Sequence, residues 1–339
     1  MLRPFLHTAA LASASVLVLA GCGSPVATDR SAAVAQAEPA GIGRAAIKPA
    51  ANCKDGQSPV ASFAPAGIGI DPSTWPKGST MAAIRKKGRL VVGTSGDVLL
   101  WGARNPGSGQ LEGYDIEVLK EVAQALGVPI TYKVINYGQR LTALQDGSVD
   151  LVAHTMTINC DRWQGTGSAP NAINFSTEYY HAGQKVLIRT DDLTTKRIED
   201  LKGKKVCVPS ASTNENQVAD MGLDLVKVNV IGDCLVKFQE GEVVAITGDD
   251  TVLAGFRAQD PYSRVIGAAF SSEPYGLGIK ADDEVFTRFV NAVLQKMRDD
   301  GTLTQIYDRT MGFAIPGAAP VDPQPVYGRV VSALARKKS

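Results

Sequence analysis

Short apolar runs alternate with amphipathic stretches along the chain from residue 89 onward. Residues 89–93 form an apolar run that predicts a buried strand. Residues 115–126 carry apolar side chains three and four positions apart, which predicts a helix ending at Gly127 and Pro129. The apolar positions are Ile116, Leu119, Val122, Ala123 and Leu126. The elements expected next are a strand over 130–135, a short helix over 141–146 and a strand over 149–152.

The same order of elements recurs further along the chain. The pattern predicts strands over 205–208, 227–230 and 243–246, and helices over 213–221 and 234–239. Residues 141–149 match residues 235–243, 94 positions later, with a helix, a glycine stop and a strand in the same places. Because strands alternate with helices, this repeat predicts two mostly parallel sheets covered by helices. A further amphipathic helix, over 283–299, is expected to face the core.

The first 22 residues have the pattern of an export signal. Arg3 precedes a short apolar stretch over 11–20, which is too short to cross a bilayer as a stable helix. The order Leu19-Ala20-Gly21-Cys22 follows and resembles the lipobox of bacterial lipoproteins, in which the signal is cleaved before the cysteine and the cysteine carries lipid. The alternative is an ordinary signal peptide with a chance cysteine.

Composition and pattern together divide the chain into parts. Residues 1–21 are the expected signal peptide, and residues 22–81, rich in Ala, Pro, Gly and Ser at their start, predict a lipid-anchored flexible tether. Residues 313–339, rich in Pro and Ala, are expected to form a disordered tail with a basic end. The two lobes cover 82–185 together with 276–312, and 186–275.

The overall charge is balanced, which narrows the range of partners. Lys and Arg number 35 and Asp and Glu 34, for a formal net charge of +1. A nucleic-acid-binding protein would normally show a basic excess, so no nucleic-acid partner is expected. The chain has three His, and no Cys or His spacing is typical of a metal site, so neither a metal nor another cofactor is expected.

Cysteine usage indicates an oxidising compartment. Of five cysteines, Cys22 is assigned to lipid, which leaves an even number for two disulfides. Four cysteines allow three pairings. Cys207 and Cys234 lie within one predicted lobe and are therefore paired, and Cys53 with Cys160 follows.

Polar side chains follow the two matched strands of the repeat. His154, Thr155, Thr157 and Arg162 come after the first strand, and residues 247–250, with two carboxylates, come after the second. In open α/β sheets, ligands sit beyond the carboxyl ends of strands, so these segments predict a cleft between two lobes. A guanidinium on one side and carboxylates on the other suit a small ligand that carries both charges, namely an amino acid.

Several motifs together resemble family 3 extracellular solute-binding proteins, the receptors of polar amino-acid ABC importers. The matching stretches are 113–118, 140–150, 155–157 with Arg162, 174–179 and 249–255, and the resemblance covers about residues 82–311. Among the members, the chain looks closest to the lipid-anchored glutamine/glutamate-binding proteins of actinobacteria. The resemblance implies an α/β, two-lobed, periplasmic-binding-protein-like (type II) fold, with a ligand cleft between lobes joined by a hinge.

The resemblance also implies roles for residues that match the family pattern. Arg162 matches the arginine that grips the ligand α-carboxylate. Thr155 and Thr157 match nearby hydroxyl and backbone contacts. Asp249 matches the carboxylate that holds the α-ammonium group, and Asp250 is expected to cap the next helix.

Four further positions carry over from the family. Ser212 and Thr213 match a helix N-terminus that offers amide donors to the ligand, although the usual preceding glycine is Ala211 here. Trp101 lies where an aromatic residue usually covers the ligand. Lys185 lies where some acidic-amino-acid receptors carry a cation, which would favour glutamate or aspartate over glutamine; the alternative is a solvated lysine on a hinge strand.

The sequence therefore predicts a monomeric receptor, anchored by lipid on the extracytoplasmic face of the cell membrane. It would bind glutamate, glutamine or aspartate and deliver the ligand to an ABC permease. Two alternatives remain open. The same body could be a sensor that signals to a membrane partner. It could also be a dehydratase-like enzyme on the same fold, with Asp250 or His154 as acid or base, although a structural role for His154 is favoured and no enzyme is expected.

Overall fold

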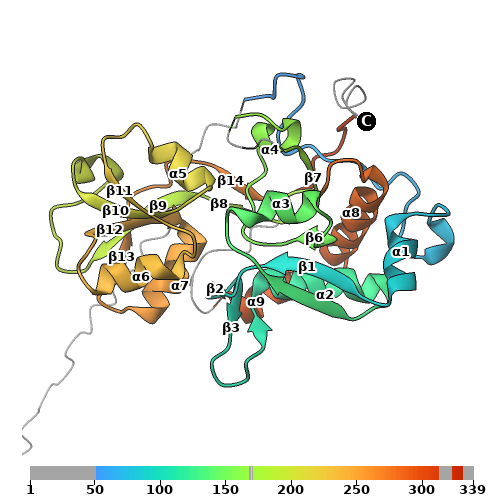
Figure 1. Cartoon of the computed structure of the whole chain (residues 1–339), viewed down its shortest axis with the longest axis horizontal. Coiled ribbons are helices and arrows are strands. Elements are labelled where there is room, and N and C mark those ends of the chain that lie inside the picture. Colours follow the sequence, from blue (N-terminus) through green and yellow to red (C-terminus); the bar gives the residue numbers. More distant parts are fainter. Residues whose placement is uncertain (1–50, 168, 170, 313–322, 331–339) are drawn as a thin grey trace, which may run out of the picture. The chain divides into compact units, whose positions relative to one another are not determined.

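The computed structural model describes residues 51–167, 169, 171–312 and 323–330, and its main body contains two five-stranded mixed sheets (Figure 1). In the first sheet the strand order is β5-β1-β6-β15-β7. Strand β1 pairs in parallel with β5 and β6, and β15 is antiparallel to both of its neighbours. The strands are β1 (Leu90–Thr94), β5 (Ile130–Val134), β6 (Leu151–Val152), β7 (Ile173–Phe175) and β15 (Gly278–Lys280).

The second sheet repeats this plan. Its order is β11-β10-β12-β9-β13, with β10 parallel to β11 and β12, and with β9 antiparallel to both neighbours. The two stretches matched in the sequence lead directly into β6 and β12, which hold equivalent places in the two sheets. The strands are β9 (Gln184–Arg189), β10 (Lys205–Pro209), β11 (Asp224–Val228), β12 (Ala245–Asp249) and β13 (Ser263–Ile266).

Helices pack on both sheets. In the first half, α2 packs against β1, α8 and α9, while in the second half α5 and α6 pack against β10 and β12. No helix within the described ranges combines the length and apolar character needed to span a bilayer. The helices are α1 (Thr80–Lys87), α2 (Tyr114–Leu126), α3 (Gln139–Gln145), α4 (Cys160–Gln164), α5 (Thr213–Val218), α6 (Gly232–Gln239), α7 (Asp250–Gln259), α8 (Glu284–Asp299) and α9 (Thr302–Thr310).

Helix α2 illustrates how the spacing of apolar residues determines where a helix forms and which side of it is buried. Its predicted apolar positions are all buried, and they form one face against the core. Gly127 ends the helix in the left-handed region at φ 69°, and its N–H is bonded to Ala123 O and Gln124 O. The helix predicted over 115–126 is therefore confirmed. The one predicted over 283–299 is confirmed as α8, whose apolar side is likewise buried.

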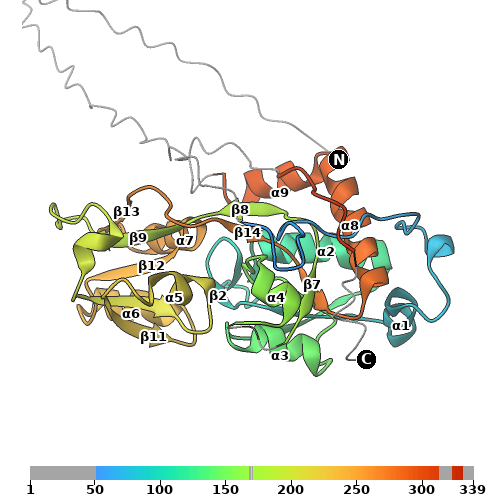
Figure 2. The same cartoon turned by 90° about the horizontal axis from the view of Figure 1, so that it is seen from above.

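Two extended segments connect the sheets. Strand β8 (Tyr180–Ala182) runs on into β9, and β14 (Glu273–Tyr275) runs on into β15. The two segments pair antiparallel with each other, with Tyr275 opposite Tyr180, and Figure 2 shows them side by side between the halves. A paired two-strand connection of this kind suits a hinge, because only a few backbone dihedrals need to change for the halves to move.

The terminal segments differ from the sequence prediction. Residues 51–81 were expected to belong to a flexible tether, but Cys53, Ala61 and Phe63 are buried. Residues 323–330, expected to belong to a disordered tail, bridge to this segment through Ser62 and Tyr327. Both predictions are wrong for the described residues, because a disulfide and hydrogen bonds across the two segments replace the regular hydrophobic pattern on which the prediction relied.

Candidate ligand-binding site

The candidate site lies where residues from both halves meet. The loop after β6 carries Thr155 and Thr157, helix α4 carries Arg162, the start of α5 carries Ser212 and Thr213, and the end of β12 carries Asp249. All six side chains that the sequence placed at this site are buried or nearly so. Buried polar groups need hydrogen-bond partners, so the partners of each side chain indicate how much of its bonding capacity is left for a ligand.

Arg162 provides positive charge from the first half. Its side chain is 6% exposed, and its Nη1 donates to Thr157 O at 2.5 Å. Burial, helped by the neighbouring charge of Arg140, lowers the pKa of Arg162 to about 9. Among the described residues, Arg162 has no ion pair with a carboxylate. The charges of Glu273 and Asp249 oppose this lowering of the pKa only in part. A buried guanidinium without a direct ion pair is costly, and an anionic ligand would relieve that cost.

Thr155 is held in an unusual conformation beside it. Its φ is 41°, in the left-handed region that a β-branched residue rarely adopts. Its backbone N donates to Asp115 Oδ2 at 2.9 Å, and Asp115 Oδ1 accepts from Tyr179 OH at 2.5 Å. Burial raises the pKa of Asp115 to about 6, despite these two donors. Asp115 thus fixes the loop that presents Thr155 and Thr157.

A hydroxyl cluster joins the two halves. Thr157 Oγ1 lies 3.2 Å from Thr213 Oγ1, and both hydroxyls donate to Glu273 Oε2, at 2.7 and 2.8 Å. Glu273 is 1% exposed, and its Oε1 accepts from Ser271 Oγ at 2.6 Å. The carboxylate of Glu273 therefore lies at the contact between the threonines predicted to meet the ligand.

Asp249 provides negative charge from the second half. Its Oδ1 accepts from Asn214 Nδ2 at 2.7 Å, and its Oδ2 accepts from Tyr275 OH at 2.5 Å. Burial, reinforced by the charge of Glu273, raises the pKa of Asp249. Asp249, and not Asp250, occupies the N-cap position of α7, and its side chain makes no capping bond. The prediction that Asp250 is the cap is wrong, because the helix begins one residue earlier and Asp250 is its first residue.

The start of α5 is built as the sequence suggested. Ser212 is its N-cap, with Oγ accepting from Glu215 N at 3.0 Å. Ala211 has φ 54°, so the position where relatives usually have glycine needs a left-handed backbone that alanine adopts at some cost. Ala211 O accepts from Arg140 Nη2 at 3.3 Å, which adds a second contact between the halves.

Arg140 and Tyr137 line the same region and were not singled out from the sequence. The Arg140 guanidinium lies 4.4 Å from the Tyr137 ring centroid, and its remaining bonds go to the backbone oxygens of Tyr137 and His154. His154 Nε2 is bonded to Ile135 O at 3.0 Å, and burial lowers its pKa to about 3. An imidazole in this state is neutral at physiological pH. Its Nε2 is bonded to the residue that follows β5, whereas its Nδ1 is buried without a partner among the described residues, so the interpretation of His154 as a fully bonded structural histidine holds only in part.

Of the other two predicted residues, Trp101 adjoins this cluster through the Tyr275 ring, whereas Lys185 lies on the other face of its sheet. Trp101 is fully buried among three tyrosine rings, with centroids 5.0 Å from those of Tyr180 and Tyr275 and 5.2 Å from that of Tyr114. Lys185 pairs with Gly248, one position before Asp249, so its side chain leaves the sheet on the opposite face from Asp249. Burial lowers the pKa of Lys185, and the charge of Asp250 opposes this shift.

The residues that sequence reasoning missed share one property. They reach the site from helices or from the crossover strand β14, and not from the loops that follow β6 and β12; they are Arg140, Asn214, Glu273 and Tyr275. A charged or amide side chain within an otherwise apolar or helical stretch is the signal that could have found them, because such a group needs a buried partner.

Two α/β halves that share one plan, joined by a paired crossover and meeting on buried groups of opposite charge, define a two-lobed solute receptor. The model of the bacterial extracellular solute-binding proteins, family 3, matches residues 90–313, and the chain belongs to this family. The predicted α/β, two-lobed, type II fold is confirmed.

Curated relatives are similar over most of their own length. The ABC transporter glutamine-binding protein GlnH of Bacillus subtilis is 30% identical over 239 residues, which is 69% of this chain and 85% of the relative. The glutamate-binding protein GluB of Corynebacterium glutamicum is 32% identical over 248 residues, or 68% of this chain and 81% of the relative. Among solved structures, an ancestral arginine-binding protein bound to glutamine has a TM-score of 0.62 at 31% identity, covering 66% of this chain and 98% of that one.

Proposed function

We propose that this protein is the substrate-binding protein of an amino-acid ABC importer and that it closes on one polar amino acid of the glutamate, glutamine and aspartate class. The observation that carries the proposal is the pair of opposite buried charges, Arg162 in one half and Asp249 in the other. Arg162 would take the α-carboxylate and Asp249 the α-ammonium group. Because neither forms an ion pair with the other, a zwitterion would supply the missing partner of each.

The ligand class is supported by the relatives. Proteins 30% and 32% identical to this chain are named for glutamine and glutamate. Thr155, Thr157, Ser212 and Thr213 would complete the grip on the α-carboxylate with hydroxyl and backbone donors, while the cover by Trp101 and the cation role of Lys185 stay predictions.

Attachment and partner belong to the same proposal. Cys22, which lies outside the described residues, would carry the lipid that holds a monomeric body at the extracytoplasmic face of the cell membrane. One acyl chain binds a membrane weakly, so a stable anchor would need more than one chain on Cys22. The closed body would then dock on an ABC permease, or on a membrane sensor protein if the receptor signals and does not transport.

A thermal-shift panel of the twenty amino acids on ligand-stripped protein tests the proposal. A ligand that binds only the folded state stabilises it by about 2.7 kcal/mol at one hundred times its Kd. We expect shifts from glutamate, glutamine or aspartate that calorimetry then confirms as one-site binding. Flat calorimetric traces with every amino acid would refute the function.

A further inference from the structure

Arg162 belongs to a helix that is too short to be stable without contacts to the rest of the protein. Helix α4 has five residues, so it is a little more than one turn. A helix this short is unstable alone, because nucleation costs more than one turn of hydrogen bonds returns. Within the helix, the Asn159 side chain caps the first turn by accepting from Arg162 N at 2.9 Å. The position of the guanidinium therefore depends on what fixes α4 from outside.

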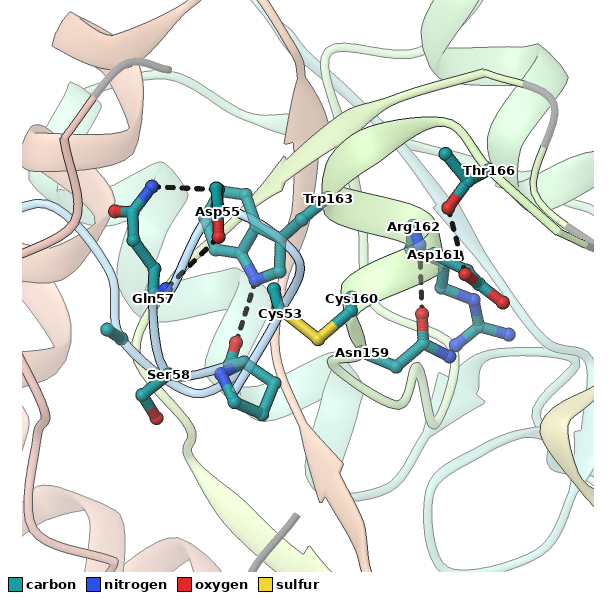
Figure 3. Close-up of a disulfide and its surroundings, with 12 residues drawn as sticks. Cys53, Asp55, Gln57, Ser58, Asn159, Cys160, Asp161, Arg162, Trp163 and Thr166 are labelled. Carbon is teal, nitrogen blue, oxygen red and sulfur yellow. Dashed lines mark hydrogen bonds between the residues drawn. A yellow bond between two sulfur atoms is a disulfide. The ribbon is translucent and has the colours of Figure 1, made fainter. Parts of the chain in front are cut away.

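The N-terminal strap, defined here as residues 53–63, fixes α4 at two points. The Cys53–Cys160 disulfide joins the strap to the first residue of the helix. Trp163 Nε1, on the residue after Arg162, donates to Pro59 O at 2.8 Å. Figure 3 shows the disulfide and the tryptophan on the strap side of α4, with the Arg162 side chain projecting the other way. Arg162 is thus flanked on both sides by residues bonded to the strap.

The strap is itself anchored on the body. Ser62 Oγ donates to Phe175 O of strand β7 at 2.7 Å, and Asn291 Nδ2 of helix α8 donates to Ser62 Oγ at 2.9 Å and to Phe63 O at 2.8 Å. From the C-terminal side, Arg329 donates to Ala61 O at 2.7 Å and to Ser58 O at 2.8 Å. These bonds make a continuous connection from the core of the first half, through the strap, to α4.

The last link is the packing on Trp163. The guanidinium carbon of Arg329 lies 3.7 Å from the Trp163 ring centroid, and Phe63 meets the same ring edge-on at 6.2 Å between centroids. The Trp163 ring also meets Phe175 of β7 at 5.6 Å between centroids. The helix is therefore held by a covalent bond to the strap at its first residue and, at Trp163, by an aromatic side chain that contacts the strap, the C-terminal segment and the first sheet.

We infer that the N-terminal strap is a positioning element for Arg162, and that the Cys53–Cys160 disulfide sets ligand affinity as well as stability. The inference rests on the proposed function, because it assigns Arg162 to the ligand carboxylate. A charge-assisted pair with a carboxylate depends on geometry, and a displacement of about 1 Å can cost on the order of 100-fold. Loss of the strap contacts would allow such a displacement without unfolding the body.

The second disulfide provides a matched control. Cys207–Cys234 joins β10 to α6 in the other half, whereas Cys53–Cys160 joins the strap to α4 in the first. A disulfide that acts only on stability would leave affinity unchanged in both cases. The experiment is calorimetric titration with L-glutamate and L-glutamine of three forms of the full chain: wild type, Cys53→Ser/Cys160→Ser and Cys207→Ser/Cys234→Ser. Urea unfolding of each form is measured alongside.

We expect Kd to rise about 10- to 100-fold in the Cys53→Ser/Cys160→Ser protein, and to stay within about 2-fold of wild type in the control, although both lose stability. If the double variant does not fold, Trp163→Phe removes the bond to Pro59, shortens the ring that Arg329 and Phe63 contact, and should still weaken binding about 3-fold. An unchanged Kd in the strap variants, or an equal loss in the control, would overturn the inference. Absence of binding by the wild type would instead count against the proposed function.

Discussion

Replacing Arg162 by methionine separates the stability of this receptor from its function. Burial lowers the pKa of Arg162 from 12.5 to about 9, which at 1.36 kcal/mol per unit corresponds to about 5 kcal/mol against the buried charge. Methionine removes that cost while keeping most of the apolar stem. It also leaves Thr157 O without its donor, which costs about 1–3 kcal/mol. The ligand-free variant should therefore be at least as stable as the wild type.

The same substitution should abolish tight binding. Truncating one partner of a buried charge pair costs about 2–5 kcal/mol, which is about 30-fold to several-thousand-fold in Kd. The thermal shift produced by the best amino acid in the panel should therefore nearly disappear at a concentration that saturates the wild type. Stability and ligand response would then change in opposite directions.

Differential scanning fluorimetry with and without ligand, followed by calorimetric titration, measures both quantities. The matched control is Arg257→Met, because Arg257 is an exposed arginine on α7 and its loss should change neither result. Near-native affinity in Arg162→Met would refute the assignment of Arg162 to the ligand. A loss of more than about 3 kcal/mol in the ligand-free variant would refute the argument that the charge of Arg162 is only partly compensated in the empty site.

Three further predictions concern the second charge, the buried carboxyl and the anchor. Asp249→Asn should weaken amino-acid binding about 10- to 150-fold by calorimetry, because a bond to a charged group is worth about 1.5–3 kcal/mol, and equal weakening for a deaminated analogue would contradict its role. Because the pKa of Asp115 rises from 3.8 to about 6 on folding, its contribution to folding should be greatest at low pH and fall by up to about 3 kcal/mol from pH ~4 to ~6. Urea unfolding of Asp115→Asn should lack this part of the pH slope, and parallel curves would argue against it. Cys22→Ser should move the protein from the membrane fraction to the soluble fraction, and retention on the membrane would argue against a lipid on that residue.

The fold could be predicted because its pattern is repeated and strongly periodic. Helix α2 was expected over 115–126 and forms over Tyr114–Leu126. The strands that follow the two matched stretches, β6 and β12, occupy equivalent places in the two sheets. The strand expected over 227–230 instead forms over Asp224–Val228. That strand lies at the edge of its sheet and starts with an exposed aspartate. Because its first residues are not fully buried, they lack the apolar run by which a buried strand is predicted.

What escaped prediction depends on tertiary contacts. Strands β2 (Asp97–Val98), β3 (Gly102–Arg104) and β4 (Leu111–Glu112) have two or three residues each, too few for a period-two pattern to be read. The strap has no hydrophobic period either, and its order comes from a disulfide and side-chain bonds to distant segments.

Only some residues of the candidate site could be predicted from the sequence. Thr157, Arg162 and Asp249 were found because they follow the ends of buried strands, where α/β sheets bind ligands. Glu273 and Tyr275 come from β14, 24 and 26 residues after Asp249, and nothing local indicates that the crossover returns them to the same place.

The Cys53–Cys160 bond also decides which half of the receptor is tied to whatever precedes it in the chain. Residue 53 is fastened to α4 and, through Ser62, to the first sheet. With a lipid upstream, the half that bears Arg162 would be the stationary one. Opening and closing of the cleft would then move the half that bears Asp249 relative to the anchored half.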